Sequence, residues 1–236
     1  MYFFIGGIFI FQYCDNFQLI NTVFNDCGAG NVGGGLALMF FNLNTYLSGI
    51  SFYSCIAAVS GGGFHSTQGN DNLMVVGTNF TGCGSMENGG GLRLGSAHNG
   101  VHIVNCVFDL CSADKGGSLQ VDTANAYVYI AGTNISRSSG VTAGGAVQFD
   151  TFNVNSSLVG VFVVDCEGTT ANGGGIQLLS DNTHIIIANS SVSNCSTEGN
   201  GGGIYVGERN DYLLVQSSEF SKCSSQGEGG MYFVTF

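Results

Sequence analysis

The sequence contains no proline and no tryptophan, and only 9% of its 236 residues are charged. An ordinary globular domain carries about 25% charged residues. Five lysines and arginines stand against 16 aspartates and glutamates, which gives a net charge of −11. This balance argues against a nucleic-acid partner, because binding a polyphosphate requires clustered basic side chains. The composition also excludes collagen, a coiled coil and an intrinsically disordered tail.

Glycine is abundant, with 39 residues, and the chain also has nine cysteines and 44% hydrophobic residues. Self-similarity at a fixed period is the signature of a repeat architecture. Here a glycine pair, one further residue and an apolar residue recur nine times at spacings of 27–29 residues. The apolar residues of the motif are Phe9, Leu36, Phe64, Leu92, Leu119, Val147, Ile176, Ile204 and Tyr232.

Further columns, meaning residues at the same position of successive repeats, run in phase with this motif. A second apolar column contains Phe24, Phe52, Phe80, Phe108, Ile135, Val163, Val192 and Phe220. Three residues later comes a column of Cys27, Cys55, Cys83, Cys111, Ser138, Cys166, Cys195 and Cys223. A polar column contains Asp15, Asn42, Asn70, His98, Asn125, Asn153, Asn182 and Asn210.

The repeat is built from strands and turns. Alternation of apolar and polar residues, as in Leu92-Arg93-Leu94, is typical of strands, and glycine runs such as Gly33-Gly34-Gly35 would break a helix. Two or three short strands in about 28 residues predict one coil of a parallel β-solenoid. Asparagine tolerates the left-handed turn conformation, and its side chain can bond to the matching asparagine of the next coil.

Two motifs resemble those of a known family. Gly173-Gly174-Gly175-Ile176 and Phe220-Ser221-Lys222-Cys223 resemble the repeats of polymorphic outer-membrane-protein-type β-helices. More broadly, they are similar to right-handed parallel β-helix proteins of the pectin-lyase-like class, although cysteine stands where the bacterial repeats usually have asparagine. The resemblance covers essentially all 236 residues. It implies one right-handed parallel β-helix domain of about eight coils, at a cell surface or outside the cell.

The two ends lead to expectations about the whole protein. Residues 1–14 fit the repeat and are too short to span a bilayer, so we expect no transmembrane segment in this chain. Gly229-Gly230-Met231-Tyr232 begins a ninth coil. Solenoids need polar capping units to protect their open strand edges, and neither end shows one. We therefore expect a segment of a longer solenoid, or a chain that associates end to end.

The cysteine column has three interpretations. A metal site requires ligands that converge as in Cys-x-x-Cys, and no such motif occurs, so we predict no metal. Disulfides between adjacent coils would require backbone distortion, because the Cα–Cβ bonds are parallel. We therefore predict buried free thiols that act as small apolar residues. We assign a structural role to this column and to Asn42, Asn70, Asn125, Asn153, Asn182 and Asn210.

The residue after each first apolar position is predicted to point outward. That column contains Ala37, His65, Arg93, Gln120, Gln148, Gln177 and Tyr205, and two residues further on Asp122 and Asp150 are expected to stack on neighbouring coils. Carbohydrate-active β-helices bind substrate along an outer strand face. The resemblance therefore implies a binding face of Arg93, Gln120, Asp122, Gln148, Asp150, Gln177 and Tyr205.

Three functions remain open from the sequence. The preferred one is a non-enzymatic scaffold of adhesin type that presents side chains to a protein or polysaccharide partner, without a cofactor. Its alternative is a polysaccharide lyase or glycoside hydrolase fragment in which Asp122 and Asp150 are catalytic, with calcium expected only for the lyase. The third is a spacer with no ligand. Repeats of nearly constant length, 27–29 residues, favour the scaffold, because functional insertions usually protrude from one side of a solenoid.

Overall fold

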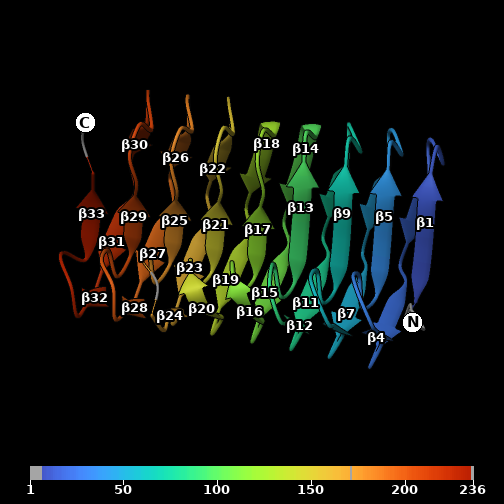
Figure 1. The fold of residues 1–236 in the computed structure, drawn as a ribbon, viewed down its shortest axis with the longest axis horizontal. Helices are drawn as coiled ribbons and strands as arrows, with labels where there is room; N and C mark the ends of the chain where they lie inside the picture. The colour runs from blue at the N-terminus through green and yellow to red at the C-terminus, as the bar shows by residue number, and fades with distance from the viewer. Residues whose placement is uncertain (1–6, 171, 235–236) are drawn as a thin grey trace.

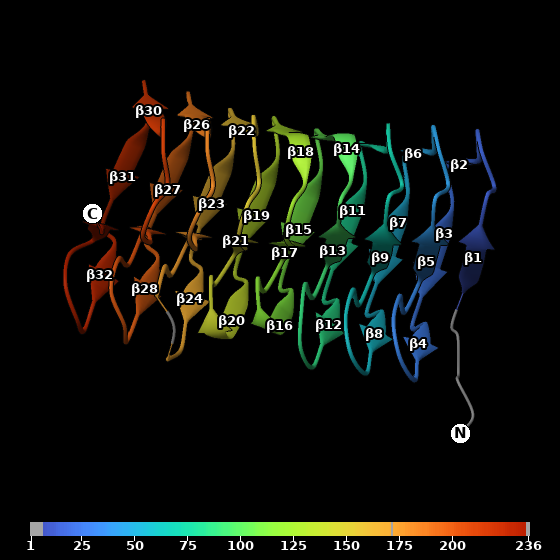
Figure 2. The ribbon, with the colours of Figure 1, turned by 45° about the horizontal axis from the view of Figure 1, so that its top comes forward.

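The computed structural model describes residues 7–170 and 172–234 as a parallel β-solenoid of about eight coils, which confirms the predicted fold class. These residues form no helix, and every strand pairs in parallel with the equivalent strand of the next coil (Figures 1 and 2). Each complete coil contributes four short strands, one more than the sequence suggested. We call the four resulting sheets A, B, C and D.

Sheets A and B contain the longest strands. The strands of sheet A are β1 (Ile8–Gln12), β5 (Leu36–Phe40), β9 (Phe64–Gln68), β13 (Leu92–Ser96), β17 (Leu119–Val121), β21 (Val147–Phe149), β25 (Ile176–Leu178), β29 (Ile204–Val206) and β33 (Met231–Phe233). The strands of sheet B are β2 (Gln18–Ile20), β6 (Tyr46–Ser48), β10 (Met74–Val76), β14 (Asn99–Val104), β18 (Ala126–Ala131), β22 (Ser157–Val159), β26 (Ile186–Ala188) and β30 (Leu214–Gln216).

Sheets C and D complete each coil. The strands of sheet C are β3 (Val23–Asn25), β7 (Ser51–Tyr53), β11 (Asn79–Thr81), β15 (Val107–Asp109), β19 (Asn134–Ser136), β23 (Phe162–Val164), β27 (Ser191–Ser193) and β31 (Glu219–Ser221). The strands of sheet D are β4 (Gly28–Ala29), β8 (Ile56–Ala57), β12 (Gly84–Ser85), β16 (Ser112–Lys115), β20 (Ser139–Ala143), β24 (Glu167–Gly168), β28 (Ser196–Thr197) and β32 (Ser224–Ser225).

The register corrects the alignment of the first and last repeats. Ile8, and not Phe9, pairs with Leu36, because the backbone N–H of Ile8 donates to the Gly35 carbonyl (2.9 Å). At the other end Met231, and not Tyr232, pairs with Ile204. Counting from the glycine pair therefore misplaced both ends by one residue, because strand pairing and not the glycine count sets the register.

A continuous apolar core fills the interior of the coils. The rings of Phe24, Phe52, Phe80 and Phe108 stack face to face on successive coils of sheet C, with centroid distances of 4.9, 4.9 and 4.5 Å. Leucine, isoleucine and valine side chains of sheets A and B surround this stack. Because each coil buries its apolar side chains against the next, stability depends on stacking rather than on any single coil.

Three glycine columns between sheets D and A have three different causes. The first, exemplified by Gly61 and Gly173, has positive φ (65° and 73°), a conformation that glycine adopts without steric cost. The second brings backbones together: a Cβ added to Gly90 would lie 2.3 Å from the Ser112 carbonyl oxygen and 2.4 Å from that of Gly117. A side chain at the second position would therefore push the stacked coils apart.

The third glycine column makes room for the phenylalanine stack. A Cβ added to Gly63 would lie 2.6 Å from the Phe80 ring, and one at Gly91 would lie 2.7 Å from the Phe108 ring. Two of the three coils with a smaller residue in the stack carry a larger residue here: Ser118 goes with Ile135 and Ala146 with Val163. The third keeps glycine, because a Cβ added to Gly175 would still lie 2.7 Å from the Val192 Cγ1. An aromatic ring in the stack therefore goes with glycine, and a smaller residue permits serine or alanine without requiring it.

The asparagine column forms a buried hydrogen-bonded ladder. Except at the step from Asn70 to His98, the side-chain oxygen of one residue accepts the backbone N–H of the residue in the preceding coil, as Asn153 does from Asn125 and Asn182 from Asn153 (both 3.0 Å). Asn70 and His98 are instead linked through the Ser66 hydroxyl (2.9 and 2.7 Å). In the first coil the place belongs to Cys14, whose N–H donates to Asn42 (2.9 Å), and not to Asp15 as the sequence suggested. The amides therefore saturate backbone donors that would otherwise be buried unpaired.

His98 takes an asparagine position in this ladder, and its substitution by asparagine should reduce acid sensitivity. Burial lowers the pKa of His98 to about 4, whereas an unfolded histidine has a pKa of about 6.5. Between these values the unfolded state binds more protons, so the stability that neutral His98 provides is present above pH 6.5 and is lost as the pH falls toward 4.

The measurement is urea unfolding of the parent and the His98→Asn variant at several pH values. Between about pH 7 and pH 4.5 the variant should lose about 1–3 kcal/mol less unfolding free energy than the parent. His65, whose pKa is lowered to about 3 mainly by burial, is present in both proteins, so most of its contribution cancels in the difference. Parallel pH profiles for the two proteins would contradict the assignment.

Candidate functional site

The predicted binding face stacks in register but is not open to solvent. His65, Arg93, Gln120, Gln148 and Gln177 pair on successive strands of sheet A. The three glutamines and His65 are nevertheless buried, with at most 3% of their surface exposed, and Arg93 is half-buried. Ala37 is also buried and Tyr205 is half-buried. The expectation that this column forms a solvent-facing strip is therefore wrong.

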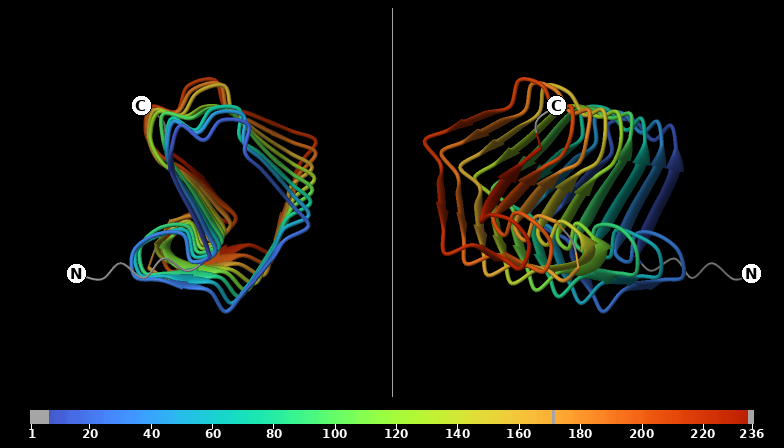
Figure 3. Two further views of the ribbon diagram at one scale, coloured as in Figure 1. Left: turned by 90° about the vertical axis from the view of Figure 1, so that its right-hand side faces the viewer. Right: turned by 60° about the vertical axis from the view of Figure 1, so that its left-hand side comes forward.

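The first glycine column explains this burial. The chain leaves sheet D, turns back and covers the outer side of sheet A, and Figure 3 shows this part of the coil as a small curl beside the main ring. A Cβ added to Gly61 would lie 2.7 Å from the His65 Cβ, and one at Gly116 would lie 3.0 Å from the Gln120 Oε1. Glycine thus lets the returning loop lie directly on the column that alternation alone places at the surface.

Asp122 and Asp150 lie at the margin of this covered zone. They follow paired residues of β17 and β21, so they occupy equivalent places on neighbouring coils. Asp122 forms an ion pair with Arg93, and the two side chains are only 13% and 22% exposed. Asp150 accepts a hydrogen bond from the Gln148 Nε2 (3.0 Å). Burial, reinforced by the Asp122 charge, raises the pKa of Asp150 above its ordinary value.

A polar network continues under the loop from Arg93. The Nη1 of Arg93 donates to the Ser60 hydroxyl (3.3 Å), which also bonds to the Nδ1 of His65 (3.2 Å), and the Nε2 of His65 bonds to the Thr67 hydroxyl (3.0 Å). Burial, with the charges of Arg93 and His98, keeps His65 neutral by lowering its pKa to about 3. This chain of contacts ties the loop to the sheet.

The glutamine column contains polar atoms without partners. Both polar side-chain atoms of Gln120 and the Oε1 atoms of Gln148 and Gln177 are buried and accept or donate no hydrogen bond within residues 7–170 and 172–234. Among the same residues, no three histidine, cysteine or acidic side chains gather as a metal site would require. The face therefore offers one carboxylate paired with an arginine and one whose pKa is raised, beside buried amides.

The cysteine column lies inside sheets C and D as free thiols. Cys55, Cys83, Cys111, Cys166 and Cys195 are buried, while Cys27 and Cys223 are half-buried. The thiol of Cys83 donates to the carbonyl oxygen of Phe52 in the preceding coil (3.5 Å), and hydrogen bonding to Cys111 raises the pKa of Cys83 to about 12. At the one interruption, Ser138 bonds to the Ser118 hydroxyl (2.6 Å).

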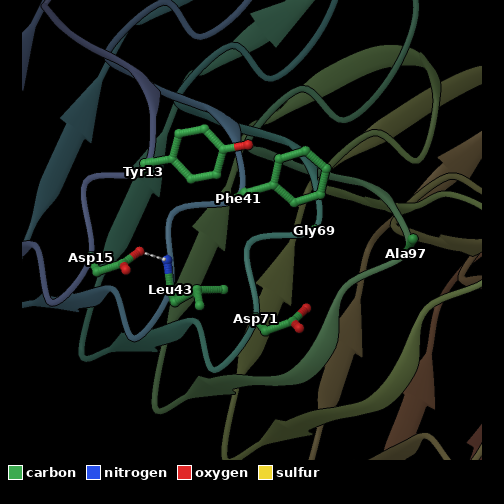
Figure 4. Close-up of a pocket in the computed structure, with 7 residues that line it drawn as sticks. All are labelled: Tyr13, Asp15, Phe41, Leu43, Gly69, Asp71 and Ala97. Carbon is green, nitrogen blue, oxygen red and sulfur yellow. Dashed lines mark hydrogen bonds between the residues drawn. The ribbon is translucent and has the colours of Figure 1, made fainter.

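Open hollows lie elsewhere, at the turn between sheets A and B. One hollow of about 360 Å³ is lined by Tyr13, Asp15, Phe41, Leu43, Gly69, Asp71 and Ala97 (Figure 4). Two further hollows, of about 310 and 340 Å³, adjoin each other through Tyr127 and Asn155. Their other lining residues are His102, Val128, Tyr129, Ser156, Ser157, His184 and Ile186.

The aromatic residues of these hollows were missed by sequence reasoning. Tyr13, Phe41 and Tyr127 have positive φ values of 53–55°, and each is at least 44% exposed. Bulky residues in this conformation are uncommon in proteins, but positive φ recurs at turns along this solenoid, as at Leu110 and Lys222, so here it marks a turn and by itself no functional site. A usable signal was present: Tyr127 takes the column position held by Asn72 two coils earlier and by Asn155 in the next coil.

Comparison of the chain with protein-family models and with curated proteins finds no match. The parallel β-solenoid is therefore established by the strand pairing alone. Across the part of the chain that the structure describes, no helix has the length and apolar character needed to cross a membrane.

Proposed function

We propose that this chain is a non-enzymatic, extended scaffold of the adhesin type, located outside the cell or at its surface, which presents aligned side chains to a glycan. The observation that supports this most is the exposed strip formed by Tyr127, Asn155, His184 and Tyr212 on successive coils. A protein partner, which the sequence left equally open, is the other possible occupant of this strip.

The strip has the chemistry that a neutral sugar requires. Tyr127 and Tyr212 are 56% and 75% exposed, and the rings of His184 and Tyr212 stack at 4.5 Å. Aromatic side chains with a polar tip combine a flat apolar face with hydrogen bonding, and the neighbouring Asn155 and Ser157 add further donors and acceptors. Neither of the two hollows is lined by a carboxylate, a lysine or an arginine.

The regular coil spacing supports an extended ligand. Successive coils are separated by about 4.8 Å, the ordinary spacing of paired strands, so equivalent side chains recur along the rod at a fixed interval. A chain of sugars can contact several coils at once, and the gain from several weak contacts is large when their geometry allows simultaneous binding. A surface scaffold that binds a glycan is also the kind of function that the resemblance to pectin-lyase-like and polymorphic outer-membrane-protein-type β-helices implies. That resemblance rests on the repeat motifs alone.

Glycan-array binding followed by titration of the best glycan tests this function. Tyr127→Asn places in the fifth coil the residue that the column already carries as Asn72 and Asn155, so the variant should fold. We expect it to bind at least about tenfold more weakly, as truncation of a central aromatic contact usually does. Tyr53→Thr, which removes an exposed tyrosine from sheet C, is the control and should bind like the parent. The glycan function fails if no glycan binds or if Tyr127→Asn binds unchanged.

The lyase or hydrolase alternative has one supporting observation, the raised pKa of Asp150 beside Asp122. Paired carboxylates with different proton affinities are used in glycoside cleavage. The test is release of reducing ends and unsaturated uronates from plant, algal and microbial polysaccharides, with and without calcium. Release that disappears in the Asp122→Asn, Asp150→Asn double variant would replace the scaffold proposal by an enzymatic one. End-to-end association of chains stays a prediction.

A further inference from the structure

The hollow near the first coils combines aromatic rings with carboxylates. Tyr13 and Phe41 occupy equivalent places on adjacent coils, and their ring centroids lie 6.1 Å apart with an interplanar angle of 16°. Figure 4 shows the two rings side by side along one edge of the hollow, with Asp15, Leu43 and Asp71 along the other edge. We call this site the aromatic–carboxylate hollow.

Small residues shape this hollow. Gly69 and Ala97 continue the column of Tyr13 and Phe41 on the next two coils. A Cβ added to Gly69 would lie 2.7 Å from the Phe41 Cδ1, so the Phe41 ring extends over this glycine. Beyond the ring, the small Ala97 side chain leaves space next to the aromatic surface. The Phe41 ring is therefore not covered by a large side chain of the next two coils, and its outer face is open to the hollow.

Backbone hydrogen bonds hold both carboxylates in place. One oxygen of Asp15 accepts the N–H of Leu43 (3.0 Å), and one oxygen of Asp71 accepts the N–H of Asn99 (2.9 Å). The second oxygen of each aspartate has no hydrogen-bond or ion-pair partner among the described residues. The two aspartates are two coils apart, about 9–10 Å, which is too far for both to bind one metal ion at 2.3–2.6 Å.

Charge distribution favours a cationic ligand in this hollow. The first 92 residues contain four acidic residues, Asp15, Asp26, Asp71 and Glu87, and no lysine or arginine. The three arginines of the chain all lie later and form ion pairs with other aspartates or glutamates. A carboxylate can accept hydrogen bonds from the hydroxyl groups of a neutral sugar, but it attracts a cation more strongly, because the opposite charge adds to the contact. A fully alkylated ammonium group has no N–H donor that requires a hydrogen-bond acceptor. Its positive charge interacts favourably with carboxylates and with the faces of aromatic rings.

We propose that the aromatic–carboxylate hollow binds an alkylated ammonium group, with its methyl groups against Tyr13 and Phe41 and its charge near Asp15 and Asp71. The cation is attracted by the ring faces, and the two carboxylates supply a negative potential that no basic side chain of residues 7–92 offsets. Arg93, in the coil of Ala97, is paired with Asp122. Free choline-like molecules and methylated lysine side chains carry the same group. This site is separate from the strip around Tyr127, and it stands whether or not that strip binds a glycan.

Titration with choline, monitored by the amide resonances of Gly69 and Ala97, tests the proposal. The neutral isostere of choline, 3,3-dimethylbutan-1-ol, has the same shape without the charge. We expect choline to bind at least about tenfold more tightly than the isostere, with an affinity that falls as salt is added. A peptide that contains trimethyl-lysine is titrated in parallel. If it binds more tightly than choline, the ligand is a methylated protein side chain; if choline binds more tightly, the ligand is a free small molecule.

Two variants test the two halves of the hollow. Phe41→Ala introduces the residue already present at Ala97, and Asp71→Asn keeps the oxygen that accepts the Asn99 N–H, so both should fold. Each should weaken choline binding roughly five- to thirtyfold, whereas Tyr127→Asn should not change it. Equal binding of choline and its isostere, absence of shifts at Gly69 and Ala97, or unchanged affinity in both variants would overturn the proposal. Loss of choline binding in Tyr127→Asn would also overturn it.

Discussion

Replacing Phe80 with alanine should lower the free energy of unfolding by about 3–5 kcal/mol. Phe80 is fully buried, and its ring stacks between Phe52 and Phe108 at 4.9 and 4.5 Å. Removing the ring leaves a cavity with aromatic faces on both sides, and the neighbouring coils cannot collapse into it because their backbone hydrogen bonds fix the spacing. Equilibrium unfolding in urea measures the loss.

A double-mutant cycle with Gly63 shows whether the glycine exists for the ring. Gly63→Ala alone should destabilise the protein, because the added Cβ would lie 2.6 Å from the Phe80 ring. In a Phe80→Val background the same change should cost less, since the contact with the ring is gone and the chain itself combines Ala146 with Val163 in a later coil. The contact of the added Cβ with the Gly91 carbonyl oxygen, at 2.8 Å, is common to both backgrounds. The interaction energy should be about 1–3 kcal/mol. Additive effects of the two substitutions would refute the size complementarity.

Gly90→Ala should be about as disruptive as the loss of Phe80, at roughly 3–5 kcal/mol, although it adds only one methyl group. The new Cβ would meet two carbonyl oxygens, those of Ser112 and Gly117, at 2.3 and 2.4 Å. Because these atoms belong to backbone and not to flexible side chains, relief requires the coils to separate and lose hydrogen bonds.

Gly28→Ala is the matched control for this prediction. A Cβ at Gly28 would meet no atom within 4 Å, and its φ is not positive. Thermal unfolding of the two variants should therefore differ widely, with Gly28→Ala within about 0.5 kcal/mol of the parent. If both glycines tolerate alanine equally, the coils do not approach as closely at Gly90 as the structure indicates.

Much of the fold could be read from the sequence because stacking repeats the same physical demand in every coil. A buried phenylalanine packs against the equivalent residue of the next coil, which must therefore also be apolar and no larger. The same residue types consequently recur about every 28 residues, and this period is visible in the sequence. The register failed only in the first coil, at Ile8 and Cys14, and in the last, at Met231, where a neighbouring repeat that would fix the alignment lies on one side only.

The candidate site could not be read in the same way. Alternation places Gln120 and Gln148 on the outer side of a strand, which is correct, but it does not reveal that the loop after sheet D returns over that side. Conversely, no column of the sequence singles out Tyr13 and Phe41. Their exposure and their place opposite Asp15 and Asp71 depend on how the turns of successive coils lie side by side.

The sequence by itself thus determined the coil: its length, its inward apolar columns and the composition that favours a solenoid. These follow from local periodicity, because each coil repeats the contacts of its neighbours. Only the tertiary structure decided which outer columns are covered and which are open. That outcome depends on the path of the loop between sheets D and A, whose glycines let its backbone lie against the side chains of His65 and Gln120. The repeat pattern shows that these glycines recur, but it does not show over which strand face the loop passes.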